Sequence, residues 1–376
     1  MNNQKDIISF ILLSNSGLSC QIFRVNENKK INLIGQSISS PEGINNGIII
    51  NVKLASKSIR HCISVAEKQA KINLSLIHIL FEPKDLLLTR VSKYKKLGGS
   101  KIHTEDISFL INEAKNQILS NDMKKNILHT YNFNYVVDNI KFLSEPINIY
   151  SDFFFHELSF LTLPKNIFKN MTQVFDNCEI TIGRFIFNPF ALGVELLSND
   201  EINNGCLIVN FDNQQTTLTI FKDASIIFYK SIPVTIGHII MDLSKGCSLT
   251  LEESQQIIKN YGIMKATNFK KGKENKQSYL NKKFFIETKY RKISENLIFD
   301  IISARAEEII EFLKKNIVSS GVNLGDLKKI YFYGNTYNID DIHELLTSSF
   351  DLLAENIVSY MDATFAGSLK ILLEGH

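Results

Sequence analysis

The stretch Cys206–Tyr229, with the sequence CLIVNFDNQQTTLTIFKDASIIFY, decides the fold of this chain. It holds three short apolar runs, over residues 206–211, 216–221 and 225–229. The polar groups DNQQ and KDA, both typical of turns, separate these runs. The pattern predicts three consecutive strands joined by tight turns, as in an antiparallel meander.

A similar pattern opens the chain. Apolar runs over Ile7–Leu13 and Cys20–Val25 flank a polar turn that contains Gly17, which predicts a β-hairpin. A helix over residues 54–70 is expected next, because Ile59, Ile63, Ala66 and Ala70 recur on one helical face. The apolar run Leu74–Leu80 then fits a buried strand.

Helix signals follow the meander. Thr250 and Glu253 have the spacing of a capping box, and Gly262 is placed to end that helix. The longest helix is predicted over 295–319, with Ser294 as its cap. Its expected apolar face comprises Leu297, Ile298, Ile301, Ile302, Ile309, Phe312 and Leu313. A strand Lys329–Tyr333, a helix from about Asp340 and a last helix Ala363–Leu373 complete an α/β fold of two related lobes.

Residues 83–161 have a different pattern, which predicts a small α/β insertion. A basic loop is expected over Lys93–Gly99, followed by a helix that begins near Thr104. Short strands are expected around Tyr131–Val137 and His156–Thr162.

Composition excludes several classes of protein. The five cysteines are scattered singly, which argues against a zinc site or a disulfide framework. No export signal is evident, and no apolar run reaches the length of about 18 residues that a transmembrane helix needs. The net charge of +3 conceals a basic loop over residues 265–292, which has ten basic and two acidic side chains. Such a loop suggests an anionic partner, or simply a solvated surface.

Motifs along nearly the whole chain resemble those of FtsA, a bacterial cell division protein of the actin and heat-shock-70 superfamily. No single motif is specific, but the pieces occur in the order of the family. They are GINNGII at 43–49, TEDI at 104–107, ILH at 127–129, YVVD at 135–138, NPFA at 188–191, IPV at 232–234 with His238 and Asp242, ARAEEI at 304–309, and AT at 363–364 with GSL at 367–369.

The resemblance implies an actin-like two-lobed fold with ribonuclease-H-like repeats and an FtsA-type inserted subdomain. The implied first-lobe core is 1–82 plus 162–191 plus 353–376, and the inserted subdomain is 83–161. The implied second-lobe core is 192–250 plus 316–352, and its outer subdomain is 251–315.

The resemblance also implies four loops that would hold ATP and Mg²⁺, and all four depart from the family pattern. The first has Leu13 in place of an aspartate, and keeps only Ser16 in a suitable role. In the second, the glycines that approach the phosphates are replaced, and the loop contains Asn210, Asp212 and Thr216. The ribose positions are Gln255 and Ile258, and the adenine loop begins with Gly334 and Asn335.

Loss of even three charge-assisted hydrogen bonds, at about 1.5–3 kcal/mol each, would weaken ATP binding by about three to six orders of magnitude. We therefore expect a pseudo-ATPase without a cofactor, unless the altered site still binds ATP and Mg²⁺.

As an FtsA-like scaffold, the protein is expected to bind the C-terminal tail of FtsZ and other division proteins, and to self-associate into actin-like filaments. Its expected place is the cytoplasm, at the division site on the inner face of the membrane. The tail-binding residues implied by the resemblance are Arg305, Glu308, Lys289, Arg291 and Lys292. Arg305 could instead simply pair with an acid on its own helix.

Three alternatives stay open at this point. A scaffold for pilus assembly like PilM would share the fold and the insertion. An actin-like ATPase would need aspartates and glycines in the phosphate loops, which this chain lacks. A role with nucleic acid rests only on the lysine run and is not expected. The family's amphipathic membrane helix after the last fold helix is also missing from this sequence, so direct membrane anchoring is not expected unless the basic loop contacts anionic lipid.

Overall fold

The structure is a computed structural model that describes residues 6–14, 17–26, 30–45, 47–142, 144–212, 215–272, 278–334 and 341–374. The chain forms two compact units. Unit 1 comprises Met1–Asn203, Ile220–Tyr229 and Ser359–His376, and unit 2 comprises Asn204–Thr219 and Lys230–Val358. This division is coarser than the four-part division expected from the sequence, which stays a prediction. Among the described residues, no helix has the length and apolar character needed to cross a membrane.

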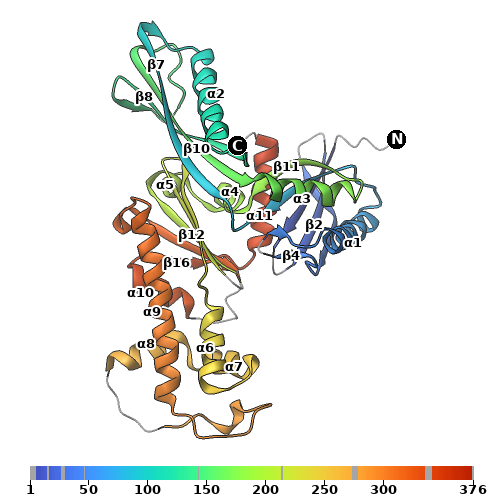
Figure 1. Ribbon diagram of the computed structural model, residues 1–376, viewed down its shortest axis with the longest axis vertical. Coiled ribbons are helices and arrows are strands. Elements are labelled where there is room, and N and C mark those ends of the chain that lie inside the picture. Colours follow the sequence, from blue (N-terminus) through green and yellow to red (C-terminus); the bar gives the residue numbers. More distant parts are fainter. Residues whose placement is uncertain are drawn as a thin grey trace. The chain divides into compact units, whose positions relative to one another are not determined.

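The central sheet of unit 1 has the strand order β11–β6–β1–β2–β3 (Figure 1). Its strands are β1 Ile7–Leu13, β2 Leu18–Val25, β3 Ile31–Ser39, β6 Leu76–Phe81 and β11 Thr181–Phe187. The predicted hairpin is confirmed, because β1 pairs antiparallel with β2 and Leu13 lies opposite Leu18. The parallel pairing of β1 with β6 then sets Leu13 beside Phe81 at the carboxyl ends of both strands.

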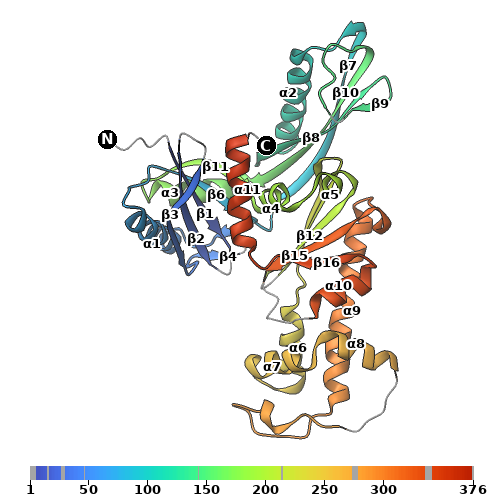
Figure 2. The same ribbon diagram turned by 180° about the vertical axis from the view of Figure 1, so that it is seen from behind.

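Helices pack on this sheet. They are α1 Val52–Ala70, α3 Lys165–Asp176, α4 Asn188–Leu196 and α11 Tyr360–Glu374, and the smaller elements of this part of the chain are β4 Ile44–Asn45, β5 Ile48–Ile49 and α5 Asn199–Asn204. The prediction of α1 is confirmed, since Ile59, Ile63 and Ala66 are buried. Helix α11 lies beside α4 (Figure 2), and its Phe365 joins a buried cluster with Phe10 of β1.

The inserted segment forms a sheet of order β7–β10–β8–β9 that α2 covers on one face (Figure 1). Its elements are β7 Leu87–Lys101, α2 Thr104–Asn121, β8 Lys125–Val137, β9 Ile140–Phe142 and β10 Tyr150–Pro164. The basic loop predicted over Lys93–Gly99 is wrong, because these residues belong to β7. The lysines fit a strand since its side chains alternate, and Lys95 forms an ion pair of 2.6 Å with Asp106 of α2. The short strands predicted around 131–137 and 156–162 are parts of β8 and β10, which have 13 and 15 residues.

The third sheet has the order β14–β13–β12–β15–β16. Its strands are β12 Cys206–Phe211, β13 Thr216–Lys222, β14 Ser225–Ile232, β15 Lys329–Gly334 and β16 Leu353–Asn356. The three strands predicted from the stretch 206–229 are therefore confirmed. Strand β12 pairs parallel with β15, and β15 pairs parallel with β16.

The remaining helices belong to unit 2. They are α6 Gly237–Cys247, α7 Leu251–Tyr261, α8 Ile263–Gly272, α9 Glu295–Ser319 and α10 Ile342–Phe350, with the 3-10 turns η2 Lys282–Phe284 and η3 Leu324–Asp326. Helix α9 has the predicted bounds, and Ile298, Ile302, Ile309 and Leu313 are buried as expected. Residues 265–292 are not simply a loop, because α8 occupies the first part of the segment and η2 lies near its end.

Residues 278–294, here called the strap, connect α8 to α9 and are held by one buried carboxylate. Glu253 of α7 is fully buried and accepts hydrogen bonds of 2.8–2.9 Å from the backbone N–H groups of Ile286, Glu287 and Thr288. It also accepts one from the Thr250 N–H, so the predicted capping box is confirmed. Burial alone would raise the pKa of Glu253, but these backbone hydrogen bonds outweigh it and lower the pKa to about 2.

Each of the two units contains both helices and sheet strands, and the insertion lies between β6 and α3 in the sequence, which agrees with the α/β fold expected from the sequence.

Replacement of Gly367 by alanine is expected to destabilise unit 1. A Cβ at this position of α11 would lie 1.9 Å from the carbonyl oxygen of Ala191 in α4. Alanine gains about 1 kcal/mol of helix propensity over glycine, but this clash with backbone costs more, so we expect a net loss of about 2 kcal/mol. Urea unfolding followed by circular dichroism measures it. Gly325→Ala is the control, since no atom lies within 4 Å of its added Cβ; equal effects of the two variants would contradict the close packing.

The Glu253 carboxylate should make the stability of unit 2 depend on pH. Its pKa is lower in the folded chain than in the unfolded one, so its contribution is complete above about pH 4.5 and is lost as the pH falls towards 2. Glu253→Gln should lower the free energy of unfolding at pH 7 by about 3 kcal/mol and flatten its dependence on pH in that window. Urea titrations at several pH values test this. The neighbouring Glu252→Gln should change neither quantity, since Glu252 is exposed; matching curves for both variants would rule out the assigned role.

Candidate functional site

The residues predicted for the second phosphate loop and the adenine loop lie at one end of a parallel strand pair in unit 2. Asn210 is opposite Tyr333, and Phe211 is opposite Gly334, at the carboxyl ends of β12 and β15. Asp212 follows β12 directly. In open α/β sheets ligands bind outside the carboxyl ends of the strands. The structure thus brings Asn210, Asp212 and Gly334 together at the edge of the sheet where a nucleotide would bind.

Gly334 is required by the sheet itself. Its φ is +103°, and a Cβ there would lie 2.5 Å from the carbonyl oxygen of Phe211 and 2.6 Å from Oδ1 of Asn210. A side chain at this position would collide with the neighbouring strand. The glycine therefore has a structural reason that is independent of any ligand.

The loop after β12 is stabilised by contacts within unit 2. The N–H of Asp212 donates to the carbonyl of Gln215 at 2.9 Å, and the Thr235 hydroxyl donates to the carbonyl of Asp212 at 2.7 Å. Thr216 is fully buried, and its hydroxyl donates to the carbonyl of Val234 at 2.6 Å. The Thr216 hydroxyl proton thus already has an acceptor within the protein.

Three other predicted nucleotide positions provide little for a ligand. Leu13 is 1% exposed at the end of β1 in unit 1, and Ile258 is fully buried in α7 of unit 2. Gln255, also on α7, is partly exposed. Ser16 and Asn335 lie outside the described residues.

The described residues at these positions do not fit a Mg²⁺–ATP site of the kind that the family resemblance implies. Such a site needs a carboxylate for the metal and free backbone donors near the phosphates. Leu13 supplies no carboxylate at the first loop, and Asp212 of the second loop belongs to no group of three or more His, Cys, Asp or Glu side chains that could hold a metal ion in the described part of the chain. The residues at these positions therefore give no support to a chemical step that uses ATP.

The second predicted site centres on Arg305, which joins two helices. Its Nε donates to Oδ2 of Asp242 on α6 at 2.6 Å, and its Nη1 donates to the carboxylate of Glu308 one turn along α9. The hydrogen bond to Asp242 raises the pKa of Arg305. Arg305 therefore pairs with the acid on its own helix, as the simpler alternative expected, and also with one 63 residues away that no local spacing could indicate.

Apolar side chains flank this charged group on the same side of α9. Leu297 is 46% exposed and Phe312 is 37% exposed. Their predicted place in the buried face of the helix is wrong. Leu297 precedes Arg305 by eight residues and Phe312 follows it by seven, so helical periodicity puts both on the side of Arg305 and not on the face that packs against the core. The spacing of Leu297 and Phe312 from Arg305 is the feature of the sequence that could have indicated their exposure.

The three basic residues predicted beside Arg305 belong to the strap. Arg291 donates to the carbonyls of Cys247 and Ser248 at the end of α6, the latter at 2.5 Å. The ammonium of Lys292 lies 5.6 Å from the ring centroid of Tyr279, and Lys289 is exposed. Sequence reasoning found the capping box of Glu253 but missed that the same carboxylate holds this segment.

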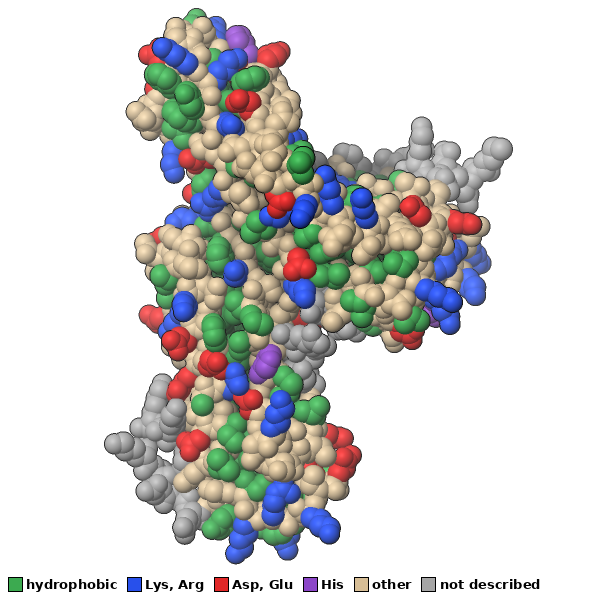
Figure 3. All heavy atoms as spheres, in the orientation of Figure 1, with side chains coloured by type: hydrophobic (Ala, Val, Ile, Leu, Met, Phe, Trp, Pro, Cys, Tyr) green, Lys and Arg blue, Asp and Glu red, His purple; other side chains and the backbone are tan. Residues whose placement is uncertain are grey.

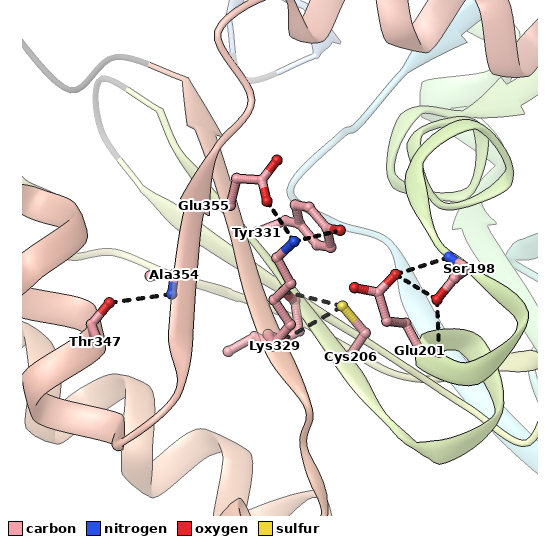
Figure 4. Close-up of polar contacts among 9 residues, drawn as sticks. Ser198, Glu201, Cys206, Lys329, Tyr331, Thr347, Ala354 and Glu355 are labelled. Atoms are coloured by element: carbon pink, nitrogen blue, oxygen red, sulfur yellow. Dashed lines mark hydrogen bonds and ion pairs between the residues drawn. The ribbon is translucent and has the colours of Figure 1, made fainter.

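A further polar cluster lies at the amino ends of β15 and β12, opposite to the candidate nucleotide positions. Nζ of Lys329 is 2.5 Å from the carboxylate of Glu355 on β16 and 3.0 Å from the hydroxyl of Tyr331 (Figure 4). Burial alone would lower the pKa of Lys329, but these two contacts outweigh it and raise the pKa. Cys206 lies on the neighbouring strand, with its thiol 3.5 Å from the Lys329 carbonyl. The cluster cross-links three parallel strands and is explained by stability alone.

The chain was compared with known proteins in sequence and in structure. No protein-family model matches the chain. Similarity in sequence is found to the cell division protein FtsA of Agrobacterium fabrum, with 20% identity over 368 residues, which cover 95% of this chain and 81% of that protein. FtsA of Buchnera aphidicola subsp. Schizaphis graminum is 24% identical over 316 residues, which cover 83% of this chain and 72% of that protein.

Solved structures share the fold. The PilM–PilN type IV pilus biogenesis complex contains a chain that matches 98% of this one, with 98% of its own length, a TM-score of 0.63 and 11% identity. MreB5 of Spiroplasma citri bound to ADP matches 99% of this chain, with 97% of its own length, a TM-score of 0.53 and 11% identity. At such identities the likeness supports the actin-like fold alone. Over most of its length the chain is thus similar in sequence to FtsA cell division proteins, and its fold is actin-like.

Proposed function

We propose that this protein is a scaffold of the division ring that binds the C-terminal tail of FtsZ, links it to septal proteins and does not hydrolyse ATP. The observation that carries the proposal is the similarity to FtsA over 95% of the chain. The similarity supports a role in cell division like that of FtsA, and binding of the FtsZ tail is the more specific part of the proposal. The site of action would be the inner face of the membrane at the division site, and self-association into filaments stays a prediction.

The exposed side of α9 is the surface proposed for the tail. It presents Leu297 and Phe312, fifteen residues apart and therefore separated by about 22 Å along the helix axis. Between them lie Arg305, Glu308 and Asp242, two carboxylates with one guanidinium and thus a net charge of −1. A short amphipathic segment with a cation between two apolar side chains complements this arrangement.

The geometry refines which residues would bind the tail. Arg305 is already paired with two carboxylates, so it orients them more than it offers a free positive charge. Of the remaining predicted residues, Arg291 holds the strap to α6, and Lys289 and Lys292 lie on the strap that precedes Leu297. These three would contact at most the end of a peptide bound along α9.

Two other functions have weaker support. The likeness to PilM is one of fold at 11% identity and brings no partner with it. The solved MreB5 structure is described as bound to ADP, but in this chain Leu13 stands where the first loop would need a carboxylate, and the Asp212 N–H and the Thr216 hydroxyl already have acceptors within the protein.

Tail binding predicts that Phe312→Ala weakens affinity for a peptide with the C-terminal sequence of the FtsZ encoded with this chain. Loss of a half-exposed aromatic contact should raise the Kd about tenfold. Fluorescence anisotropy of a labelled peptide measures this. Arg305→Ala is a poorer probe, because it leaves Asp242 and Glu308 as neighbouring unpaired acids.

The matched control for this experiment is Val318→Ala. Val318 is 62% exposed on α9 but lies on another side of the helix, so its truncation should leave the Kd within twofold. Unchanged affinity in Phe312→Ala, or equal losses in both variants, would refute the proposed surface.

Absence of ATP binding predicts that 1 mM ATP with Mg²⁺ shifts the melting temperature no more than Mg²⁺ alone. Leu13 supplies no metal ligand, and the Asp212 N–H and the Thr216 hydroxyl already have acceptors within the protein, so any Kd should exceed the concentration used, and ligand stabilisation should be below about 0.4 kcal/mol. Differential scanning fluorimetry and calorimetry provide the measurement. A micromolar Kd would refute the assignment.

A further inference from the structure

The strap presents cations and apolar side chains together on one exposed segment. Among residues 278–294 the sequence has five basic side chains and one acidic side chain, a net charge of +4. Ile286 is 54% exposed, Tyr279 48% and Tyr290 44%. The exposed lysines of the segment are Lys282, Lys283, Lys289 and Lys292. Figure 3 shows Lys and Arg side chains gathered at the end of unit 2 that α7 and the strap form.

The aromatic rings of the strap lie against its lysines. Nζ of Lys282 is 5.1 Å from the ring centroid of Tyr290, and Nζ of Lys292 is 5.6 Å from that of Tyr279. Each pair combines the apolar ring and lysine methylene groups with a charged ammonium and a polar hydroxyl on the same part of the surface. Tyrosine and lysine in this arrangement are typical of segments that lie at the boundary between lipid headgroups and acyl chains.

The strap is already ordered in the folded chain. Glu253 binds three consecutive backbone N–H groups at residues 286–288, and Arg291 binds the carbonyl end of α6. The carboxylate of Glu295 accepts hydrogen bonds from Ser278 and Tyr261. Binding would therefore not require this segment to fold, which lowers its entropic cost.

The single acid of the strap does not cancel its charge. Glu287 is exposed, and its backbone N–H, not its carboxylate, makes the contact with Glu253. The buried Glu253 is satisfied by backbone donors, so it takes no lysine out of solution. The positive charge of the strap is thus available to an anionic partner.

We propose that the strap binds the surface of an anionic lipid bilayer, with Ile286, Tyr279 and Tyr290 at the headgroup level and the lysines on lipid phosphates. Exposed Ile286 distinguishes this partner from nucleic acid or an acidic peptide, because a bilayer offers an apolar phase beside its negative charge. The proposal goes beyond the proposed function and assigns Lys289 and Lys292 to lipid instead of to the FtsZ tail.

The test uses the full chain and vesicles of phosphatidylcholine with 0–40% phosphatidylglycerol, in a flotation assay at 50–300 mM salt. Binding should require phosphatidylglycerol and fall with salt. Each lysine near such a surface contributes about fivefold, so Lys282→Glu with Lys283→Glu should lower the partition coefficient at least about 25-fold. Lys53→Glu with Lys57→Glu on α1 changes the net charge equally at exposed positions and should leave binding within about twofold.

A second variant tests the apolar part of the proposal. Ile286→Ser should weaken vesicle binding severalfold at constant charge, whereas Val358→Ser, at a position that is 83% exposed, should not. No binding to anionic vesicles at 50 mM salt, equal loss in the α1 control pair, or full retention in Ile286→Ser would each overturn the proposal.

Affinity for the FtsZ tail peptide separates this proposal from the proposed function. The Lys282→Glu and Lys283→Glu pair should leave peptide affinity within twofold while vesicle binding is lost. Loss of peptide binding together with retained vesicle binding would assign the strap to the peptide and overturn the lipid site. If the unaltered chain fails to bind the peptide but binds anionic vesicles, the proposed function is refuted and the lipid site is supported.

Discussion

The carboxylate of Glu253 is fully buried, and its charge is balanced by backbone N–H groups from two segments. This arrangement fixes the start of α7 and the middle of the strap at the same point. Both exposed surfaces described for unit 2 depend on it, because the strap leads directly into the first turn of α9, where Leu297 lies. If one lysine of the strap paired with Glu253 instead of these backbone donors, its positive charge would be cancelled and would no longer be exposed to solvent.

The features that the sequence predicted well are those set by neighbouring residues. The N-terminal hairpin, the three strands within 206–229, the capping box at Thr250 and the bounds of α9 follow from local turns, caps and periodicity. The long strand β7 was missed because its lysines and glycines are typical of a loop. Its extended form depends on pairing with β10, some sixty residues away, and on the ion pair between Lys95 and Asp106. Pairing between strands so far apart in the chain produces no pattern among neighbouring residues from which it could be predicted.

In the candidate sites, too, contacts between neighbouring residues could be predicted from the sequence, and contacts between distant residues could not. Arg305 and Glu308 are adjacent on one helical turn, so their association could be predicted, whereas Asp242 joins them only through the packing of α6 on α9. Leu297 and Phe312 were assigned to the core because an apolar residue in a helix is usually buried. At the strand ends the sequence indicated altered nucleotide loops, and the structure adds that Gly334 and Thr216 have roles inside the sheet that need no ligand.

The close packing of α11 against α4 has a consequence for how the chain is made. Phe365 of α11 completes a cluster whose other members include Phe10, so unit 1 joins the beginning of the polypeptide to residues some 350 positions later. Strand β1 leaves the ribosome long before its partner helix is synthesised, while all of unit 2 emerges in between. The part of the apolar surface around Phe10 that α11 covers therefore stays without that helix until the end of translation, and this nascent surface is where a chaperone would bind.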